Sequence, residues 1–428
     1  MKTGIATLLA LMLALACTAS LAQEYVSISE LYDQTQAMGG WWRETFDTPN
    51  GEMTVDVPII VPDAETMPVM TLKPAKISRE AYDVISGGRK ATRRANAFEF
   101  TLDIDGVLCD FFLGNVKPEE KRYETIQRFW IRRGSYRYGA KDDGNKDVKP
   151  VTYHYPWEIE SDKVHARNQK MTLDDVMRLW RREIERYYAG QGYVIEPKRI
   201  TLHGSLLSEK RGTNARYERT GYYAVDAEQY IAGFPVFGAV ANNVSNVNGT
   251  FRVSFTSTRE TNRIEERMDA YRKGAQEACY YHLTAFVADE EDHQIMTNLL
   301  DVRSEEHADI PLAPLDRVLA GVRREIEAGH IQEVYAIRLG YLLYSNPDMT
   351  DHAWAVPRWV VDCNYITDEN RDTVAYFRER RQGSVDIWNA WEFVQMPVDA
   401  QSGELLILTT GDERTFSVPE IVTWNDAE

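Results

Sequence analysis

Residues 314–343 constrain the fold most, because an amphipathic helix runs directly into a strand there. Pro314 suits the first turn of a helix, and Gly329 suits the left-handed residue that ends one. Beyond Gly329 the apolar period changes to two, which indicates a strand with one buried face. The helix carries one apolar stripe at the spacing of 3.6 residues per turn, made of Leu315, Val318, Leu319, Val322 and Ile326.

A similar stretch occurs upstream. Thr172 and Asp175 have the spacing of a capping box and open a second amphipathic helix. Its residues 181–185 and residues 323–327 both read RREIE at the same phase of the stripe, and each helix leads into a strand, 200–207 or 337–343. A shared helical period alone would not reproduce the pentapeptide and then the strand. We therefore expect an internal duplication. The upstream stripe is Leu173, Val176, Met177, Trp180 and Ile184.

These patterns predict an α+β fold with a hairpin-rich N-terminal domain and two related modules, each a helix packed on an antiparallel sheet. The expected boundaries are a signal peptide over 1–22, the N-terminal domain over 23–165 and the first module over 166–262. A connecting segment would cover 263–310, and the second module 311–428.

The first residues have the pattern of an export signal. Lys2 is positive, residues 5–16 are apolar, and Ser20-Leu21-Ala22 is a small-x-small site, so cleavage after Ala22 is expected. The apolar run is too short for a mature membrane span, so the mature chain would be secreted without a transmembrane segment. A lipoprotein signal is the alternative, because Cys17 follows Ala14-Leu15-Ala16 and would anchor the protein to a membrane.

The net charge and the cysteine content limit which partners and which class of protein are compatible with the sequence. The formal net charge of −17 among 428 residues argues against nucleic acid as the main partner. Removal of Cys17 leaves 4 − 1 = 3 cysteines, which is no disulfide framework for so long a chain. Cys109, Cys279 and Cys363 are therefore expected to be buried thiols, with one bridge at most.

Residues 98–113 admit two interpretations. Asp103-x-Asp105-Gly106 resembles the nucleophile loop of haloacid-dehalogenase-type phosphatases, in which the first Asp attacks phosphorus and the second is the acid/base. The other interpretation is a hairpin turning on Asp105-Gly106, which we favour because the sequence alternates. A two-residue turn pairs apolar residues on one face: Ile104 with Val107, Leu102 with Cys109, Phe100 with Phe111, and Phe98 with Leu113.

Residues 119–141 interleave basic and aromatic side chains. Such a patch in an acidic chain could hold an anionic wall polymer or glycan through charge and ring stacking. The alternative is two strands around Gly134 with a solvated arginine face. The candidate ligand-binding residues are Arg128, Trp130, Arg132, Arg133, Tyr136 and Arg137.

No catalytic signature is present in the sequence. It has no HExxH, GxSxG, phosphate-binding glycine loop or paired-cysteine zinc spacing, so we expect no enzyme, cofactor or metal site. The expected function is a secreted, non-catalytic binding or regulatory protein. Its partner would be an extracellular protein, a peptide or an anionic wall polymer, and a protein ligand would add to a sheet edge.

The C-terminal quarter resembles a known type of module. A helix, a strand ending Leu339-Gly340-Tyr341 and a turn at residues 399–403 (DAQSG) are similar to the small α+β modules of YycH/YycI- and PepSY-type extracytoplasmic proteins. With its export signal, the whole chain also resembles a family of secreted proteins of unknown function from Gram-positive bacteria. The resemblance implies binding or regulation in place of catalysis.

Overall fold

A computed structural model gives the arrangement of most of the chain. It describes residues 25–75, 92–94, 97–104, 107–114, 128–133, 151–154, 171–188, 192–207, 219–237, 283–287, 290, 293–297, 299–344, 352–365, 394–405 and 420–427.

The described elements are four helices and 17 strands. The helices are α2 (Ile28–Ala37), α5 (Leu173–Tyr187), α9 (Leu315–Glu327) and α11 (Trp424–Ala427). The strands are β1 (Trp41–Thr48), β2 (Gly51–Ile60), β3 (Val69–Pro74), β4 (Thr92–Arg94), β5 (Ala97–Ile104), β6 (Val107–Gly114), β7 (Arg128–Arg133), β8 (Val151–His154), β9 (Val194–Leu207), β10 (Arg219–Ile231), β11 (Phe234–Phe237), β12 (Leu283–Val287), β13 (His293–Thr297), β14 (Leu300–His307), β15 (Ile331–Tyr344), β16 (Ala353–Tyr365) and β17 (Val394–Asp399).

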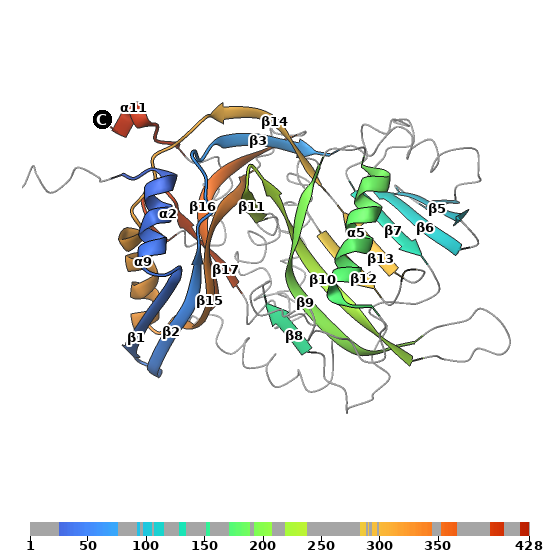
Figure 1. Ribbon diagram of the computed structural model, residues 1–428, viewed down its shortest axis with the longest axis horizontal. Coiled ribbons are helices and arrows are strands. Elements are labelled where there is room, and N and C mark those ends of the chain that lie inside the picture. The colour runs from blue at the N-terminus through green and yellow to red at the C-terminus, as the bar shows by residue number, and fades with distance from the viewer. Residues whose placement is uncertain are drawn as a thin grey trace, which may run out of the picture.

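The strands form one curled mixed sheet of half-barrel shape, so the fold is α+β (Figure 1). One half, which we call the α5 half, is antiparallel throughout, in the order β4–β5–β6–β7–β13–β12–β10–β9–β8. The other, the α9 half, has the order β1–β2–β15–β16–β17, in which β2 and β15 are parallel. The first residues of β16 also pair with β3, and β3 pairs in turn with β14, so the α9 half includes these two strands.

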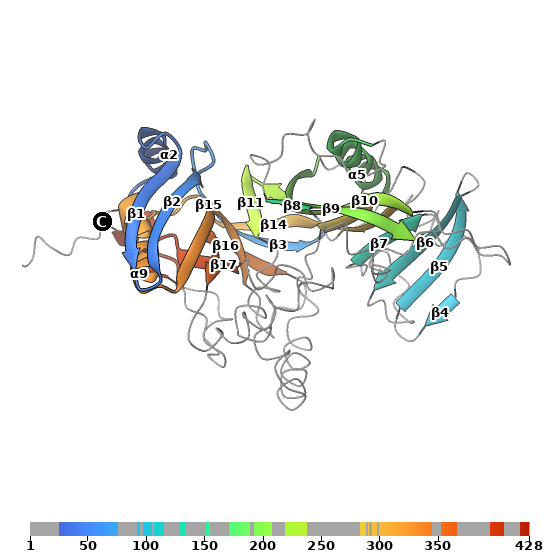
Figure 2. The same ribbon diagram turned by 90° about the horizontal axis from the view of Figure 1, so that it is seen from below.

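The short strand β11 joins the two halves. It turns back antiparallel on β10 through Ala232 and Gly233, both at positive φ, and then runs parallel to β15. Seen from below, the sheet passes continuously from β1 at one end to β4 at the other (Figure 2). Strands expected in a single N-terminal domain over 23–165 are thereby divided, because β1–β3 lie in the α9 half and β4–β8 in the α5 half.

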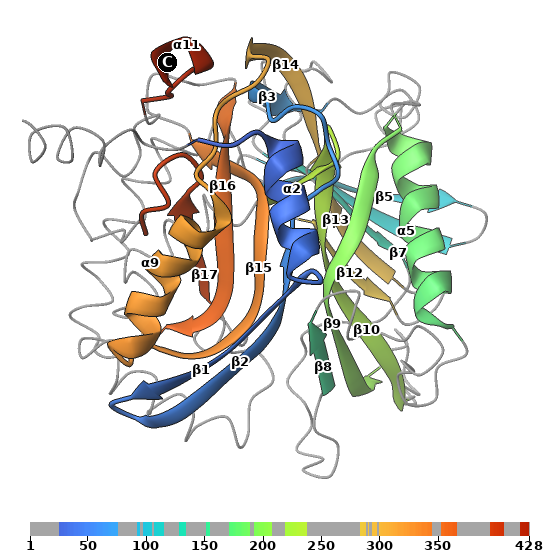
Figure 3. The same ribbon diagram turned by 60° about the vertical axis from the view of Figure 1, so that its left-hand side comes forward.

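The two predicted helices are present with their stripes buried. All five stripe residues of α9 and all five of α5 are at most 5% exposed. Thr172 and Asp175 form the expected capping box, and Gly329 has the expected positive φ of 77°. Figure 3 shows α2 and α9 side by side on the α9 half. The residue that caps α2 is Ser27, which forms a capping box with Glu30.

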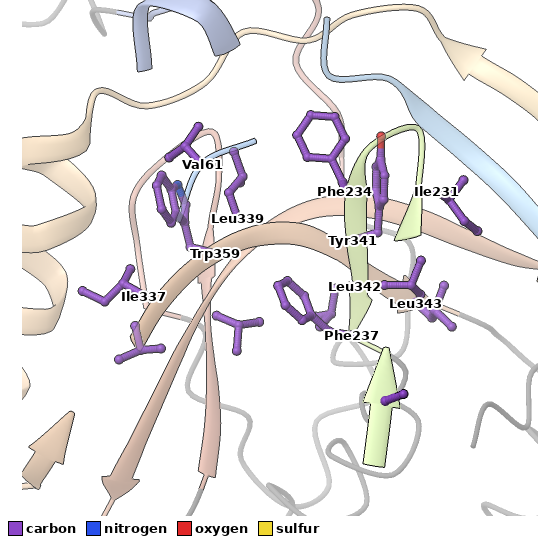
Figure 4. Packing of buried hydrophobic residues seen from close by; sticks show 14 of the residues in the cluster. Val61, Ile231, Phe234, Phe237, Ile337, Leu339, Tyr341, Leu342, Leu343 and Trp359 are labelled. Atoms are coloured by element: carbon purple, nitrogen blue, oxygen red, sulfur yellow. The ribbon is translucent and has the colours of Figure 1, made fainter. Parts of the chain in front are cut away.

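Buried apolar side chains of one continuous core pack around β15 (Figure 4). Trp359 of β16 lies beside Leu339, its register partner on β15. Further along β15 the ring of Tyr341 meets that of Phe234 edge to face, with centroids 5.6 Å apart. The β11 segment therefore packs directly on the strand that the sequence placed at the centre of the fold.

The predicted hairpin at residues 98–113 is confirmed. β5 and β6 are antiparallel, and all four expected pairs are found, from Ile104 with Val107 to Phe98 with Leu113. Asp103 thus lies on an antiparallel strand and is paired with Leu108 of β6. The phosphatase loop would instead follow a parallel strand and precede a helix.

The strands that follow α5 and α9 match in length and irregularity. β9 and β10 have 14 and 13 residues and pair as an antiparallel hairpin, and so do β15 and β16. Each hairpin has two register shifts, and one of them falls at the fifth residue of the first strand in both, which leaves Lys198 of β9 and Tyr335 of β15 as extra residues. The pairs on either side are Arg199↔Asp226 and Pro197↔Ala227 in the first hairpin, and Ala336↔Asp362 and Val334↔Cys363 in the second.

Among the described residues, no helix has the length and apolar character needed to cross a membrane.

Candidate functional site

Buried charges meet where the two halves join. The guanidinium of Arg338, on β15, donates from Nε to Asp362 Oδ2 of β16 at 2.7 Å. From its other side it donates through Nη1 and Nη2 to both carboxylate oxygens of Glu228, on β10, with 3.2 Å between Nη2 and Oε1. Arg338, Glu228 and Asp362 are at most 4% exposed. Arg338 therefore links the two halves of the sheet. It binds Glu228 in a bidentate geometry, to which the planar guanidinium of arginine is suited.

A second cation completes this charge network. Lys198, the extra residue of the β9 bulge, lies 3.3 Å from Glu228 Oε1, and Arg338 lies over the Phe237 ring, 5.0 Å from its centroid. Burial alone would raise the pKa of Glu228, but Arg338 and Lys198 outweigh burial and hold that pKa below its ordinary value. The carboxylate thus stays ionised, and an ionised, fully paired carboxylate is unsuited to general acid catalysis.

The backbone of β15 must come close to β11 for these contacts to form. A Cβ on Gly340 would lie 2.3 Å from the carbonyl oxygen of Pro235 and 2.8 Å from the Phe237 ring. Only glycine leaves room for this approach. The strand therefore combines a charged residue with a glycine two positions later, within an otherwise apolar run.

Arg358 is a second buried arginine, on β16. Its Nε donates to the Tyr344 hydroxyl at 3.1 Å, and its Nη2 lies 3.1 Å from Asp399 Oδ2. The other oxygen of Asp399, Oδ1, accepts from the backbone N–H groups of Gln401 and Ser402, both at 2.8 Å. Asp399 therefore orders the DAQSG turn and neutralises Arg358.

Sequence reasoning missed the charge network, although a signal was present. Arg338 interrupts ten residues that are otherwise apolar or glycine (335–344), and Asp362 follows the apolar run at 359–361. A charge inside a buried strand requires a partner. Its partner Glu228 is 110 residues away in sequence, so no local pattern connects them.

The outer edge of β1 is the second feature with binding potential. β1 pairs with β2 over all eight of its residues without a bulge, and among the described residues it has no strand on its other side. The even-numbered residues face α9: Trp42 and Phe46 are buried, and Glu44 accepts from Arg323 Nε at 2.9 Å. Arg43, Thr45 and Asp47 are exposed. The edge therefore belongs to a strand that is held rigidly on one side only.

The register identifies which backbone groups point outward. Ile59 N donates to Gly40 O at 2.9 Å, so the bonded pairs of this ladder are those of the even-numbered β1 residues. The N–H and C=O groups of residues 41, 43, 45 and 47 therefore point away from β2. Pro58, which has no N–H, lies opposite Trp41, a position at which β2 donates nothing to β1.

Among the described strands, β14 also has an edge with no paired strand, but that edge is less suited to strand addition. β14 pairs with β3 through two register shifts, and its residues 303–306 (RSEE) are exposed and mostly charged. Bulges and charges of this kind discourage edge pairing. β1 is the flatter edge.

The predicted ligand-binding patch is divided by the sheet. Arg128, Trp130, Arg132 and Arg133 lie on β7, between β6 and β13, whereas Tyr136 and Arg137 lie outside the described residues. Residues at facing positions of neighbouring strands share one face of the sheet. Arg133 faces His293 of β13, His293 faces Val287 of β12, and Val287 faces Tyr223 of β10. The Tyr223 hydroxyl donates to Met171 O at the start of α5. Position 133 is therefore on the α5 face, and positions 128, 130 and 132 share the opposite face.

The remaining candidates are placed only in part. Cys363 is a buried free thiol as expected, and burial raises its pKa. Cys109 lies on β6, whereas Cys17, Cys279, Asp105 and the signal segment lie outside the described residues. Within the described part of the chain, no group of three or more His, Cys, Asp or Glu side chains could hold a metal ion.

Comparison with known proteins gives one structural likeness. No protein-family model matches this chain, and no curated protein matches it. The crystal structure of an uncharacterised protein from Eubacterium rectale, at 1.45 Å resolution, is similar to it with 12% sequence identity and a TM-score of 0.41. The alignment covers 82% of this chain and 90% of that chain. A likeness at this level carries no conclusion about family, ligand or activity.

Proposed function

We propose that this protein is an extracytoplasmic, non-catalytic binding or regulatory protein that takes an extended segment of another protein onto the outer edge of β1. The observation that carries the proposal is the row of outward backbone groups at residues 41, 43, 45 and 47, which has no strand partner in the described part of the chain. Strand addition draws affinity from such groups. By contrast, the buried acids Glu228 and Asp362 and the partly buried Asp399 are occupied in ion pairs.

The chain offers a matched pair of variants to test this. Thr45→Pro removes one outward N–H while leaving the bonds of β1 to β2, because proline is tolerated on an edge strand where its nitrogen faces solvent. Thr45→Val keeps that N–H. Both variants lose the contact of Thr45 Oγ1 with Thr54 Oγ1 at 3.3 Å. The two variants therefore differ mainly in whether residue 45 offers an N–H group at the outer edge of β1.

The measurement is selection of strand-forming peptides from a displayed random library, followed by titration of the best synthetic peptide. We expect wild type and Thr45→Val to bind alike, and Thr45→Pro to bind at least tenfold more weakly. Circular dichroism verifies that all three are folded. Equal binding by both variants would show that the ligand does not use this edge.

Export and duplication belong to the same proposal. We infer that residues 1–22 direct export, so the mature N-terminus is Gln23, or a lipidated Cys17 if the lipoprotein signal is used. We also infer that α5 with β9–β10 and α9 with β15–β16 are two copies of one module of the YycI- or PepSY-like type. The shared bulge supports this, because chance similarity of two amphipathic helices would not reproduce it. N-terminal sequencing and mass spectrometry of protein from the producing cells test the first inference.

A second ligand class is favoured by one observation. Positions 128, 130 and 132 share the face of the α5 half opposite α5, as a surface for an anionic wall polymer or glycan requires. Arg128→Glu/Arg132→Glu should abolish a salt-sensitive thermal shift with teichoic acid, whereas Arg133→Glu, on the other face, should not. A shift equally sensitive to Arg133→Glu would contradict this surface.

A further inference from the structure

The outer edge of β1 carries its own electrostatic complement. Along the edge the sequence reads basic at Arg43, neutral at Thr45 and acidic at Asp47. If a second β1 runs antiparallel with Thr45 opposite Thr45, each Arg43 lies opposite the Asp47 of the second copy. Oppositely charged pairs at facing positions stabilise a sheet, and here symmetry forms two of them.

Other registers are less favourable. Only outward-pointing residues can bond to each other, so the register can shift only in steps that keep odd positions opposite odd positions. One such step away from the Thr45 register, in one direction, places Glu44 opposite Glu44 of the second copy. In the other it places Arg43 opposite Pro49, which has no N–H to donate. The register centred on Thr45 avoids both defects.

The side chains concerned are accessible. Arg43 is 69% exposed and its Nε lies 2.9 Å from Asp56 Oδ1, a pair that is itself solvent-exposed. Exposed ion pairs contribute little and re-form readily. A guanidinium has five N–H donors, so Arg43 can keep Asp56 and still bind Asp47 of the second copy.

We propose that in the free protein the outer edge of β1 is closed by β1 of a second copy, antiparallel and centred on Thr45, and that a ligand strand must displace that copy. The proposal rests on the proposed function, since it requires an edge that accepts strands. Flat edges are rarely left open in native proteins, and self-pairing closes this one. One strand pair per dimer buries little surface, so the dimer is weak and depends on protein concentration.

Charge reversal tests the register directly. Sedimentation equilibrium across a hundredfold concentration range should show a monomer–dimer equilibrium for the wild type. Arg43→Asp places two carboxylates opposite each other and Asp47→Arg two guanidinium groups, so each variant alone should stay monomeric. An equimolar mixture of the two restores opposite charges at both positions and should form a heterodimer. Glu327→Arg, which makes the same charge change as Asp47→Arg on an exposed site of α9, should dimerise as the wild type does.

The failure of this inference can be distinguished from failure of the proposed function. A wild type that is monomeric throughout overturns self-pairing, while peptide binding sensitive to Thr45→Pro would still stand. Dimers that survive either single reversal, or reversed variants that do not associate when mixed, overturn the Thr45 register. Circular dichroism of each variant verifies that a monomer is a folded monomer.

Discussion

Arg338 shows how much of this fold depends on a single side chain. It bonds two carboxylates that come from different halves of the sheet, at a depth where an unpaired charge is costly. Aliphatic replacement would leave both Glu228 and Asp362 buried without their main cation. The junction of the halves is therefore the place where a one-residue change should have its largest effect.

We predict that Arg338→Met lowers the free energy of unfolding by about 3–5 kcal/mol, the usual cost of removing one partner from a buried ion pair. Arg43→Met is the matched control, because Arg43 also pairs with an aspartate but is exposed. Its free energy of unfolding should equal that of the wild type within error. Chemical denaturation of the three proteins gives the comparison, and equal losses in both variants would contradict the role of the junction.

Stability should also depend on Glu228 in acid. Its pKa is lower in the folded protein than the ordinary value of 4.5, so the folded state binds its proton less readily than the unfolded chain does. The resulting stabilisation is complete above that ordinary value and is lost as the pH falls through the lower, folded value. Glu228→Gln should be less stable at pH 7 and should lose less further stability below pH 4.5. A parallel pH dependence in both proteins would contradict this assignment.

At the scale of elements, the sequence was most informative where a helical or strand pattern continues over many residues. The stripes of α5 and α9, the β5–β6 register and the capping box at Thr172 all follow from spacing that a few neighbouring residues determine. Spacing alone does not place the cap of α2, because Ser27 and Ser29 are both plausible caps and only the side chain of Glu30 selects Ser27. Division of the N-terminal strands between the halves could not be foreseen. It depends on β2 pairing with β15, about 280 residues later.

The buried stripe of α9 gives a prediction at this scale. Ile326→Asp places a carboxylate in a site that is 0% exposed, and should cost about 4–5 kcal/mol or unfold the α9 half outright. Glu327→Asp changes the adjacent, exposed position and should be neutral. Thermal melts followed by circular dichroism measure both, and a cooperative melt of Ile326→Asp near the wild-type temperature would contradict the packing of α9.

At the scale of the whole molecule, the two halves differ in how they can meet a partner. The α5 half is antiparallel across nine strands, while the α9 half ends at β1, whose outer groups have no partner among the described residues. The sequence predicted strand addition but not which edge, because an edge exists only once the order of strands is known. Arg128, Trp130 and Arg132 were likewise identified as a group, but their separation from Arg133 required the β7–β13 register.

Amide hydrogen exchange, resolved residue by residue, tests binding at β1 most directly. The protein would be measured at a concentration where it is monomeric, with and without the tightest peptide from the library. Strand addition predicts slower exchange at Arg43, Thr45 and Asp47, whose amides point outward. Trp42, Glu44 and Phe46 should change little, because their amides already bond to β2. Protection that lacks this alternation, or that falls on another strand, would contradict the account.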